Sequence, residues 1–175
     1  MITWAGFLLV VAAAVLVALG YPLAGGCLML FSASFDFLDG ALARGTNRVT
    51  RFGGILDSTL DRISEAAMLL GVMAYYLFRP AVFDPWIALL AGLAITASFM
   101  VSYIRSRAEA ANLDCQVGIS TRPERVVVLG SGLILSVISH YFMVGAMALI
   151  SLLSTVTVVQ RLVHVYKQSR KGQAG

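Results

Sequence analysis

The chain has 175 residues, of which 59% are hydrophobic and only 13% are charged. A soluble domain of this size carries about 25% charged residues, and here the apolar residues come in long runs instead of amphipathic stripes. The composition therefore excludes an ordinary soluble protein and indicates a polytopic membrane protein. The formal net charge is +4, and the positions of the basic residues are more informative than their number. We expect no nucleic-acid partner.

Six apolar segments, each of about 17–27 residues, are long enough to cross a hydrocarbon core of about 30 Å. We predict an all-α fold in which six transmembrane helices surround a polar cavity that faces the cytoplasm. No repeat or second domain is visible, so residues 1–175 form a single domain. The predicted spans cover residues 3–19, 23–43, 52–78, 85–107, 123–139 and 142–166.

Lysine and arginine fall mainly in three clusters, which follow every second apolar segment. By the positive-inside rule this side is cytoplasmic, which places both termini there in an integral membrane protein, as expected of a prokaryotic cell membrane. The two cysteines, Cys27 and Cys115, match no metal-binding spacing, and we expect unpaired thiols. The basic clusters lie at residues 44–51, 105–125 and 161–171.

Four aspartates lie in two pairs inside this apolar chain, Asp36 with Asp39 and Asp57 with Asp61. Spacings of three and four residues place each pair on one face of a helix. A short polar loop at residues 45–51 joins the two segments, so the acidic faces of antiparallel neighbours converge. Because four carboxylates in an apolar setting repel one another, the pattern indicates two hard divalent metal ions. The alternative is a set of structural salt bridges with nearby arginines.

Small residues follow the first aspartate pair, with Gly40 directly after Asp39 and Ala43 one turn later. They leave a groove along the helix, which suits either close helix packing or a flat group such as a nucleobase. Arg44 stands where it could bind a phosphate through two parallel hydrogen bonds. The residues alone leave both uses of the groove open.

On these residues the chain resembles the CDP-alcohol phosphotransferase family, and the layout of six spans agrees too. The resemblance implies an enzyme that depends on Mg2+ or Mn2+. Such an enzyme transfers a substituted phosphate from a CDP-linked donor to an alcohol and releases CMP. Eight fixed positions carry the match: Asp36-x2-Asp39-Gly40-x2-Ala43-Arg44-x8-Gly53-x3-Asp57-x3-Asp61.

The resemblance also implies a role for each matching residue. Two metal ions would be held by the four aspartates, Asp36, Asp39, Asp57 and Asp61. Asp61 would in addition be the general base that takes the proton from the acceptor hydroxyl. The CDP part of the donor lipid would be bound by Gly40, Ala43, Arg44 and Thr50.

Four arginines flank the cytoplasmic boundary of the later segments: Arg105, Arg122, Arg125 and Arg161. Guanidinium groups beside a metal site suit an acceptor that already carries a phosphate. The alternative for each arginine is the positive-inside bias or contact with anionic lipid headgroups. The region resembles the branch of the family that joins CDP-diacylglycerol or CDP-archaeol to inositol 1-phosphate, although Arg105 stands where that branch often has lysine. The resemblance implies that the four arginines bind inositol 1-phosphate and that CDP-diacylglycerol is the donor.

Two other functions stay open. One is a phosphatidylglycerophosphate synthase that uses glycerol 3-phosphate as the acceptor. The other is a divalent-cation transporter, since aspartates within a membrane can line an ion path. Against a transporter, the acidic residues cluster at one boundary and no polar residues continue to the other side. We expect a homodimer.

Members of the family usually begin with a cytoplasmic amphipathic helix and a Pro-Asn-x-x-Thr element. Thr3 matches the threonine of that element, and the rest is absent from the sequence. We therefore expect the single domain to lack this helix.

Overall fold

In a computed structural model the chain is helical, and the described residues contain no strand. The structure describes the backbone of residues 2–45 and 50–172 and the side chains of residues 4–34, 50 and 52–170. The prediction of an all-α fold is confirmed over these ranges. The elements are α1 (Ile2–Ala18), α2 (Pro22–Gly45), α3 (Arg51–Phe78), a short 3-10 helix η1 (Pro80–Val82), α4 (Pro85–Ala110), α5 (Arg122–Leu135) and α6 (Tyr141–Gly172).

Side-chain caps fix where α3 and α4 begin. The hydroxyl of Thr50 accepts a hydrogen bond from the backbone N–H of Gly53 at 3.0 Å. The carboxylate of Asp84 accepts from two N–H groups in the first turn of α4, which starts with proline. Such caps satisfy N–H groups that have no partner within the helix. Thr50, expected to contact the donor nucleotide, therefore also has a structural task.

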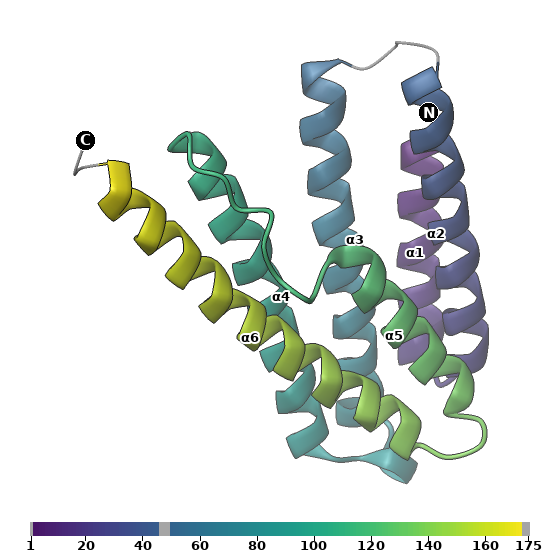
Figure 1. Cartoon of the computed structure of the whole chain (residues 1–175). Coiled ribbons are helices and arrows are strands. Elements are labelled where there is room, and N and C mark those ends of the chain that lie inside the picture. Colours follow the sequence, from purple (N-terminus) through teal and green to yellow (C-terminus); the bar gives the residue numbers. More distant parts are fainter. Residues whose placement is uncertain (1, 46–49, 173–175) are drawn as a thin grey trace.

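Helix α5 is shorter than the predicted segment 123–139, because it ends at Leu135. The hydroxyl of Ser136 donates to the carbonyl of Leu133 at 2.6 Å, which competes with the helical pattern. At its other end, the 111–121 connection runs from the top of α4 down to the middle of the bundle, where α5 begins (Figure 1). The 111–121 connection and the N-terminus of α5 therefore lie in the interior of the bundle.

Helix α6 continues past the predicted end of its segment, to Gly172. Its last turns contain contacts at i,i+4 spacing, which stabilise a helix. The guanidinium of Arg170 lies 5.2 Å from the centre of the Tyr166 ring, and Gln168 lies within hydrogen-bonding distance of His164 at 3.2 Å. The basic end of the chain is therefore an extension of this helix up to the last described residues.

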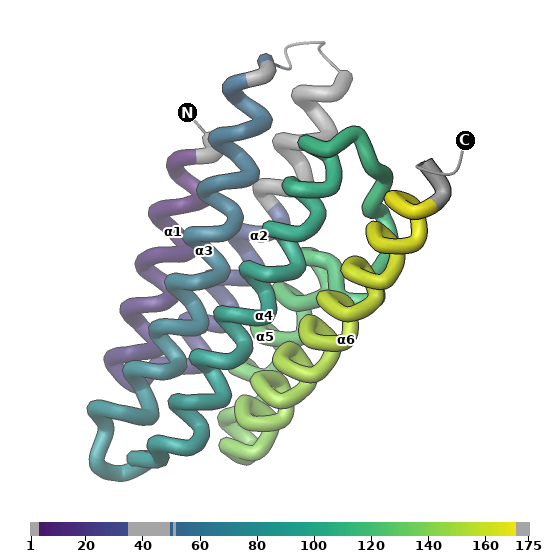
Figure 2. Tube along the Cα trace, turned by 90° about the vertical axis from the view of Figure 1, so that its left-hand side faces the viewer, coloured from purple at the N-terminus to yellow at the C-terminus, as the bar shows by residue number. Residues whose placement is uncertain are grey.

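The six α-helices pack in a closed ring, in which each helix has two main neighbours. Helix α1 packs against α2 and α3, whereas α4 packs against α3 and α6, and α5 packs against α2 and α6. Helix α1 begins, and α2 and α4 end, at the upper end of the bundle, towards which α6 also ascends (Figures 1 and 2). This agrees with the predicted placement of both termini on one side.

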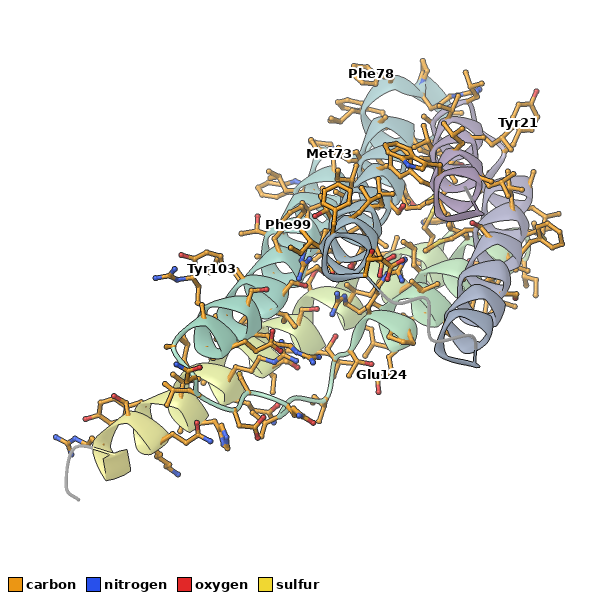
Figure 3. The ribbon with its side chains drawn as sticks, turned by 90° about the horizontal axis from the view of Figure 1, so that it is seen from above. Tyr21, Met73, Phe78, Phe99, Tyr103 and Glu124 are labelled. Atoms are coloured by element: carbon orange, nitrogen blue, oxygen red, sulfur yellow. The ribbon has the colours of Figure 1, made fainter. Side chains whose placement is uncertain are left out.

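Large apolar side chains cover the outside of the bundle, including Tyr21, Phe78 and Tyr103, which point away from it (Figure 3). Soluble proteins rarely expose continuous apolar surface on this scale. Within the described residues, α4 and the part of α6 at Tyr141–Arg170 are long and apolar enough to cross a membrane, while Trp4–Ala18 and Pro22–Ser34 are shorter apolar helices. The chain is an integral membrane protein.

Close packing between α1 and α3 depends on Gly71. A Cβ atom at this position would lie 2.5 Å from the carbonyl oxygen of Ala14. We expect Gly71→Ala to lower the free energy of unfolding by about 1–3 kcal/mol, because the helix backbones would have to separate. Thermal unfolding in detergent measures the effect. Gly92→Ala is the matched control, since a Cβ atom at that position would have no neighbour within 4 Å; an equal loss in both variants would contradict the packing argument.

Candidate active site

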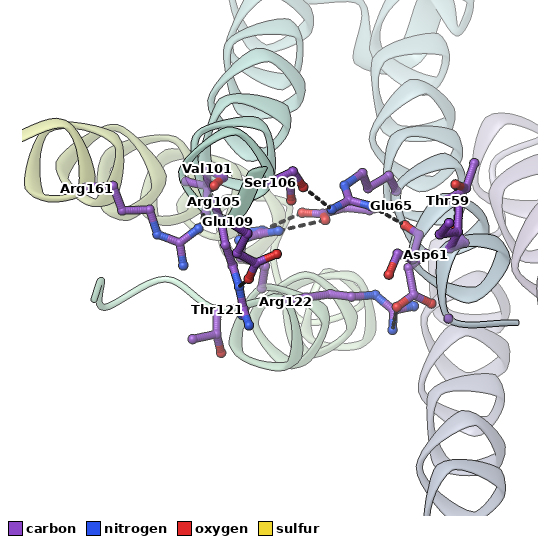
Figure 4. A pocket seen from close by; sticks show the side chains of 16 residues that line it. Thr59, Asp61, Glu65, Val101, Arg105, Ser106, Glu109, Thr121, Arg122 and Arg161 are labelled. Carbon is purple, nitrogen blue, oxygen red and sulfur yellow. Dashed lines mark hydrogen bonds and ion pairs between the residues drawn. The ribbon is translucent and has the colours of Figure 1, made fainter. Parts of the chain in front are cut away.

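A polar cavity of about 620 Å³ opens between α3, α4, α5 and α6 (Figure 4). Its described wall carries five arginines and three carboxylates, an excess of two positive charges. A phosphate monoester carries about −1.5 to −2 charges near neutral pH, so the wall suits such a ligand. The charged lining residues are Asp61, Arg62, Glu65, Arg105, Glu109, Arg122, Arg125 and Arg161.

Asp61, the proposed general base, lies on this wall and forms an ion pair with an arginine from another helix. Its Oδ2 lies 2.7 Å from Nη1 of Arg122, which belongs to the first turn of α5. Both side chains are partly exposed, at 23% and 33%. The structure thus brings together a residue expected to act on the acceptor hydroxyl and one expected to bind the acceptor phosphate.

Arg125 lies one turn further along α5 and is almost fully buried, with 4% of its side chain exposed. Its Nε and Nη2 donate to the two carboxylate oxygens of Glu65 at 2.5 and 2.8 Å. Its Nη1 donates to the carbonyl of Ser120 at 3.0 Å. Three of the five N–H groups of this guanidinium are therefore committed to protein atoms, and two remain.

Arg161 ties α6 to the neighbouring segments through backbone carbonyls. Its Nε donates to Val117 of the 111–121 connection at 2.9 Å, and its Nη1 donates to Val101 of α4 at 2.5 Å. Arg161 is 5% exposed, and its hydrogen bonds go to these carbonyls while its side chain lines the cavity. Among the described residues this buried guanidinium has no carboxylate partner, which favours binding of an anion.

The 111–121 connection is held in place by α6 and by its own backbone conformation. The N–H of Ser120 donates to Oγ1 of Thr157 at 3.0 Å. Gly118 has φ +127°, and a Cβ there would collide with the side chain of Thr157. This backbone region is open to glycine and strained for other residues. Burial raises the pKa of the Cys115 thiol in this connection, and both Cys115 and Cys27 are free, as expected.

Arg105 is the most open of the four predicted acceptor-binding arginines. Its Nε donates to Glu109 one turn later at 2.8 Å, with side-chain exposures of 51% and 57%. An exposed pair of this kind holds a side chain only weakly. Arg105 can therefore turn towards a ligand at little cost, unlike Arg125 and Arg161.

The chain is similar to known proteins over almost its whole length. Residues 1–166 match the family described as CDP-alcohol phosphatidyltransferase. The chain belongs to this family. Membership confirms the resemblance seen in the sequence and favours a transferase over a cation transporter.

The chain is also similar to individual members of the family. It is 38% identical over 169 residues to the archaetidylinositol phosphate synthase of Methanothermobacter thermautotrophicus, covering 95% of this chain and 82% of that protein. It is 35% identical over 160 residues to the phosphatidylinositol phosphate synthase of Mycobacterium tuberculosis, covering 87% and 71%. The crystal structure of the latter enzyme with CDP-DAG bound gives a TM-score of 0.87 at 35% identity, covering 94% of this chain and 84% of that chain. A structure of that enzyme with manganese and citrate also gives 0.87, covering 94% and 80%.

The donor side of the site is described only in part. Asp57 is exposed on α3, one turn before Asp61, and it is not part of the cavity wall. The described residues contain no group of three or more potential metal ligands. The side chains of five predicted site residues lie outside the described set: Asp36, Asp39, Gly40, Ala43 and Arg44.

The two aspartate side chains of α3 nevertheless fit the coordination of a hard divalent metal. Asp57 and Asp61 are spaced by one helical turn, and both are partly accessible to solvent. They offer only oxygen ligands, which Mg2+ and Mn2+ prefer. Asp36 and Asp39 belong to the C-terminal half of α2, whose end faces the start of α3 across a short connection.

Several polar residues of the cavity wall were not among the site residues predicted from the sequence. Arg62 donates to the carbonyl of Ser58 at 2.7 Å and to the hydroxyl of Ser106 at 3.4 Å, which links α3 to α4. Helical spacing could have found some of them, since residues three and four apart share a face. Three residues before and four residues after Arg105, this spacing leads to Ser102 and Glu109.

Proposed function

We propose that the chain transfers the phosphatidyl group of CDP-diacylglycerol to inositol 1-phosphate, with release of CMP. The observation that carries this proposal is the cavity in which Asp61 meets the four arginines of α4, α5 and α6. The excess of positive charge on its wall suits an acceptor that carries a phosphate. Relatives named as inositol phosphate lipid synthases support the same assignment.

In this proposal Asp61 is the general base for the acceptor hydroxyl. An alcohol holds its proton tightly at neutral pH, and a nearby carboxylate can accept that proton as the oxygen attacks phosphorus. The ion pair between Asp61 and Arg122 keeps the base next to a phosphate-binding group. An acceptor whose phosphate binds Arg122 therefore has its hydroxyl near the carboxylate, which is the proximity that the transfer requires.

The acceptor phosphate is bound by Arg105, Arg122, Arg125 and Arg161. Arg125 and Arg161 are fixed by hydrogen bonds to the protein and supply preorganised charge. Arg105 is exposed and supplies a mobile arm. The CDP group of the donor is bound by Gly40, Ala43, Arg44 and Thr50.

Two Mg2+ or Mn2+ ions complete the site, held by Asp36, Asp39, Asp57 and Asp61. When bound, such ions offset the charge of the pyrophosphate and of the departing CMP. We expect chelation with EDTA to abolish CMP release and added Mg2+ or Mn2+ to restore it. The assay measures released CMP. A chelated sample to which Ca2+ is added is the control for coordination geometry, because Ca2+ has the same charge but is larger and adopts looser coordination. Full activity in EDTA would contradict the metal assignment.

We also propose that all six helices cross the membrane, with both termini and the cavity on the cytoplasmic side. Two observations support this orientation: the placement of the basic clusters, and the fact that α1 begins and α2 and α4 end at the same end of the bundle. A homodimer in a prokaryotic cell membrane is part of the proposal. Accessibility of single cysteines to a membrane-impermeant maleimide in intact cells tests the orientation.

The decisive experiment presents purified protein, Mg2+ and CDP-diacylglycerol with different acceptors. The acceptors are inositol 1-phosphate, glycerol 3-phosphate, inositol and serine, and CMP release is measured. We expect release with inositol 1-phosphate. Release with glycerol 3-phosphate alone would instead identify a phosphatidylglycerophosphate synthase. A parallel arm with CDP-archaeol tests the donor, because one similar relative is named an archaetidylinositol phosphate synthase.

A further inference from the structure

Glu65 occupies the centre of the polar interior. It is 8% exposed, and it borders the main cavity as well as two small voids. One void lies between α3 and α4 beside Leu69 and Phe99. The other lies beside Val10, Met29 and Val126, among α1, α2, α3 and α5. A carboxylate in such a place needs a charged or hydrogen-bonding partner, because burial of an unpaired charge is costly.

That partner is Arg125, and the pair joins two helices that both line the main cavity. The principal packing partners of α5 are α2 and α6, whereas the cavity and one void lie between α3 and α5. Two ion pairs bridge this space. Asp61 meets Arg122, and one turn deeper Glu65 meets Arg125.

The two ion pairs differ in strength. The outer pair joins partly exposed side chains, which solvent and ligands can replace. The inner pair is a buried fork of two parallel hydrogen bonds, with side-chain exposures of 4% and 9%, and such forks fix orientation as well as distance. The same guanidinium also holds the carbonyl of Ser120, the residue before the N-cap Thr121 of α5. The inner pair therefore sets where α5 begins.

We propose that Glu65 is a positioning residue for the acceptor site. Its fork to Arg125 holds the first turn of α5 at the distance from α3 at which Arg122 meets Asp61. It also orients Arg125 so that the two remaining N–H groups are kept for the acceptor. Without the Glu65 carboxylate, Arg125 loses both hydrogen bonds that fix its orientation, and the phosphate site and its distance from the base are both disturbed. The inference rests on the proposed function for the identity of the acceptor.

The kinetic test compares Glu65→Gln with Glu65→Asp and Glu124→Gln. Glutamine keeps the shape of the side chain and removes its charge, whereas aspartate keeps the charge and shortens the reach. Glu124→Gln is the matched control, because this exposed residue belongs to the same first turn of α5 and glutamine also serves in a capping box. We expect Glu65→Gln to raise the KM for inositol 1-phosphate about tenfold or more while the KM for CDP-diacylglycerol stays within about twofold. Glu124→Gln should leave both unchanged.

A binding measurement separates this inference from the proposed function. Calorimetric titration of the full chain in detergent with inorganic phosphate needs no turnover and no particular acceptor. We expect Glu65→Gln to weaken phosphate binding about tenfold or more and Glu65→Asp to weaken it less. If the wild-type chain releases no CMP with inositol 1-phosphate, the proposed function fails, and the phosphate titration still decides the role of Glu65.

Three outcomes would overturn the inference. The first is unchanged phosphate binding and acceptor KM in Glu65→Gln. The second is an equal loss for donor and acceptor, which would indicate a general structural role. The third concerns the case in which Glu65→Gln fails to fold. Glu65→Asp then takes its place, and we expect it to fold and to show a raised KM for the acceptor. Wild-type kinetics in Glu65→Asp would leave Glu65 only a structural role.

Discussion

Asp61→Asn is expected to reduce turnover by about 10²–10⁴-fold, the range associated with the loss of a general base. Asparagine has nearly the same shape but cannot accept the proton of the acceptor hydroxyl. The change also removes the anionic partner of Arg122, which lies 2.7 Å away. Much of the binding of the donor lipid should remain, because three of the four proposed metal ligands and the proposed nucleotide contacts are unchanged.

The measurement is CMP release under single-turnover conditions, together with a separate titration of CDP-diacylglycerol. Asp84→Asn is the matched control, since this residue caps α4 outside the cavity wall and asparagine caps helices as well as aspartate does. Wild-type turnover in Asp61→Asn would refute the role of Asp61 as base. Loss of donor binding in parallel with turnover would show that its main task is to hold metal.

Arg161→Gln is expected to raise the KM for the phosphorylated acceptor by about 10–100-fold, the range for loss of hydrogen bonds to a charged group. The guanidinium binds the carbonyls of Val101 and Val117, so the variant should also lose about 1–3 kcal/mol of stability. Arg161→Lys keeps the charge but loses the planar geometry, and we expect an intermediate effect.

Initial rates over a grid of donor and acceptor concentrations separate the two KM values. Arg170→Gln is the control on the same helix, because Arg170 is exposed and lies over the ring of Tyr166, beyond the cavity. A lower kcat with an unchanged acceptor KM would mean that Arg161 only supports the 111–121 connection. An effect on the donor KM alone would move Arg161 out of the acceptor site.

Local patterns predicted much of this protein. Long apolar runs predicted the helices. The spacing of Asp57 and Asp61 correctly put them one turn apart on α3. These features depend on contacts within a few residues, which a helical period fixes. The family assignment from the aspartate pattern is confirmed by the match over residues 1–166.

Partners across helices could not be predicted in this way. Salt bridges to arginines nearby in the sequence were only the alternative to a metal site, and Asp61 forms an ion pair with Arg122 of α5, far along the chain. Any of several arginines could have met Glu65, and the tertiary structure selected Arg125. The choice depends on how deeply the 111–121 connection descends before α5 begins, and Gly118 and Thr157 set that depth through a contact between distant parts of the chain.

The sequence by itself thus determined the helices, the membrane character and the family. Only the tertiary structure decided that Arg125 is committed to a carboxylate and that Arg161 binds backbone carbonyls. The physical reason is that an ion pair between two helices depends on the length, charge and burial of both side chains and on how the helices pack. The periodicity of a single helix does not specify any of these. Glu65 illustrates the difference, because in the sequence it is one acidic residue beside Asp61, and in the fold it joins α3 to α5.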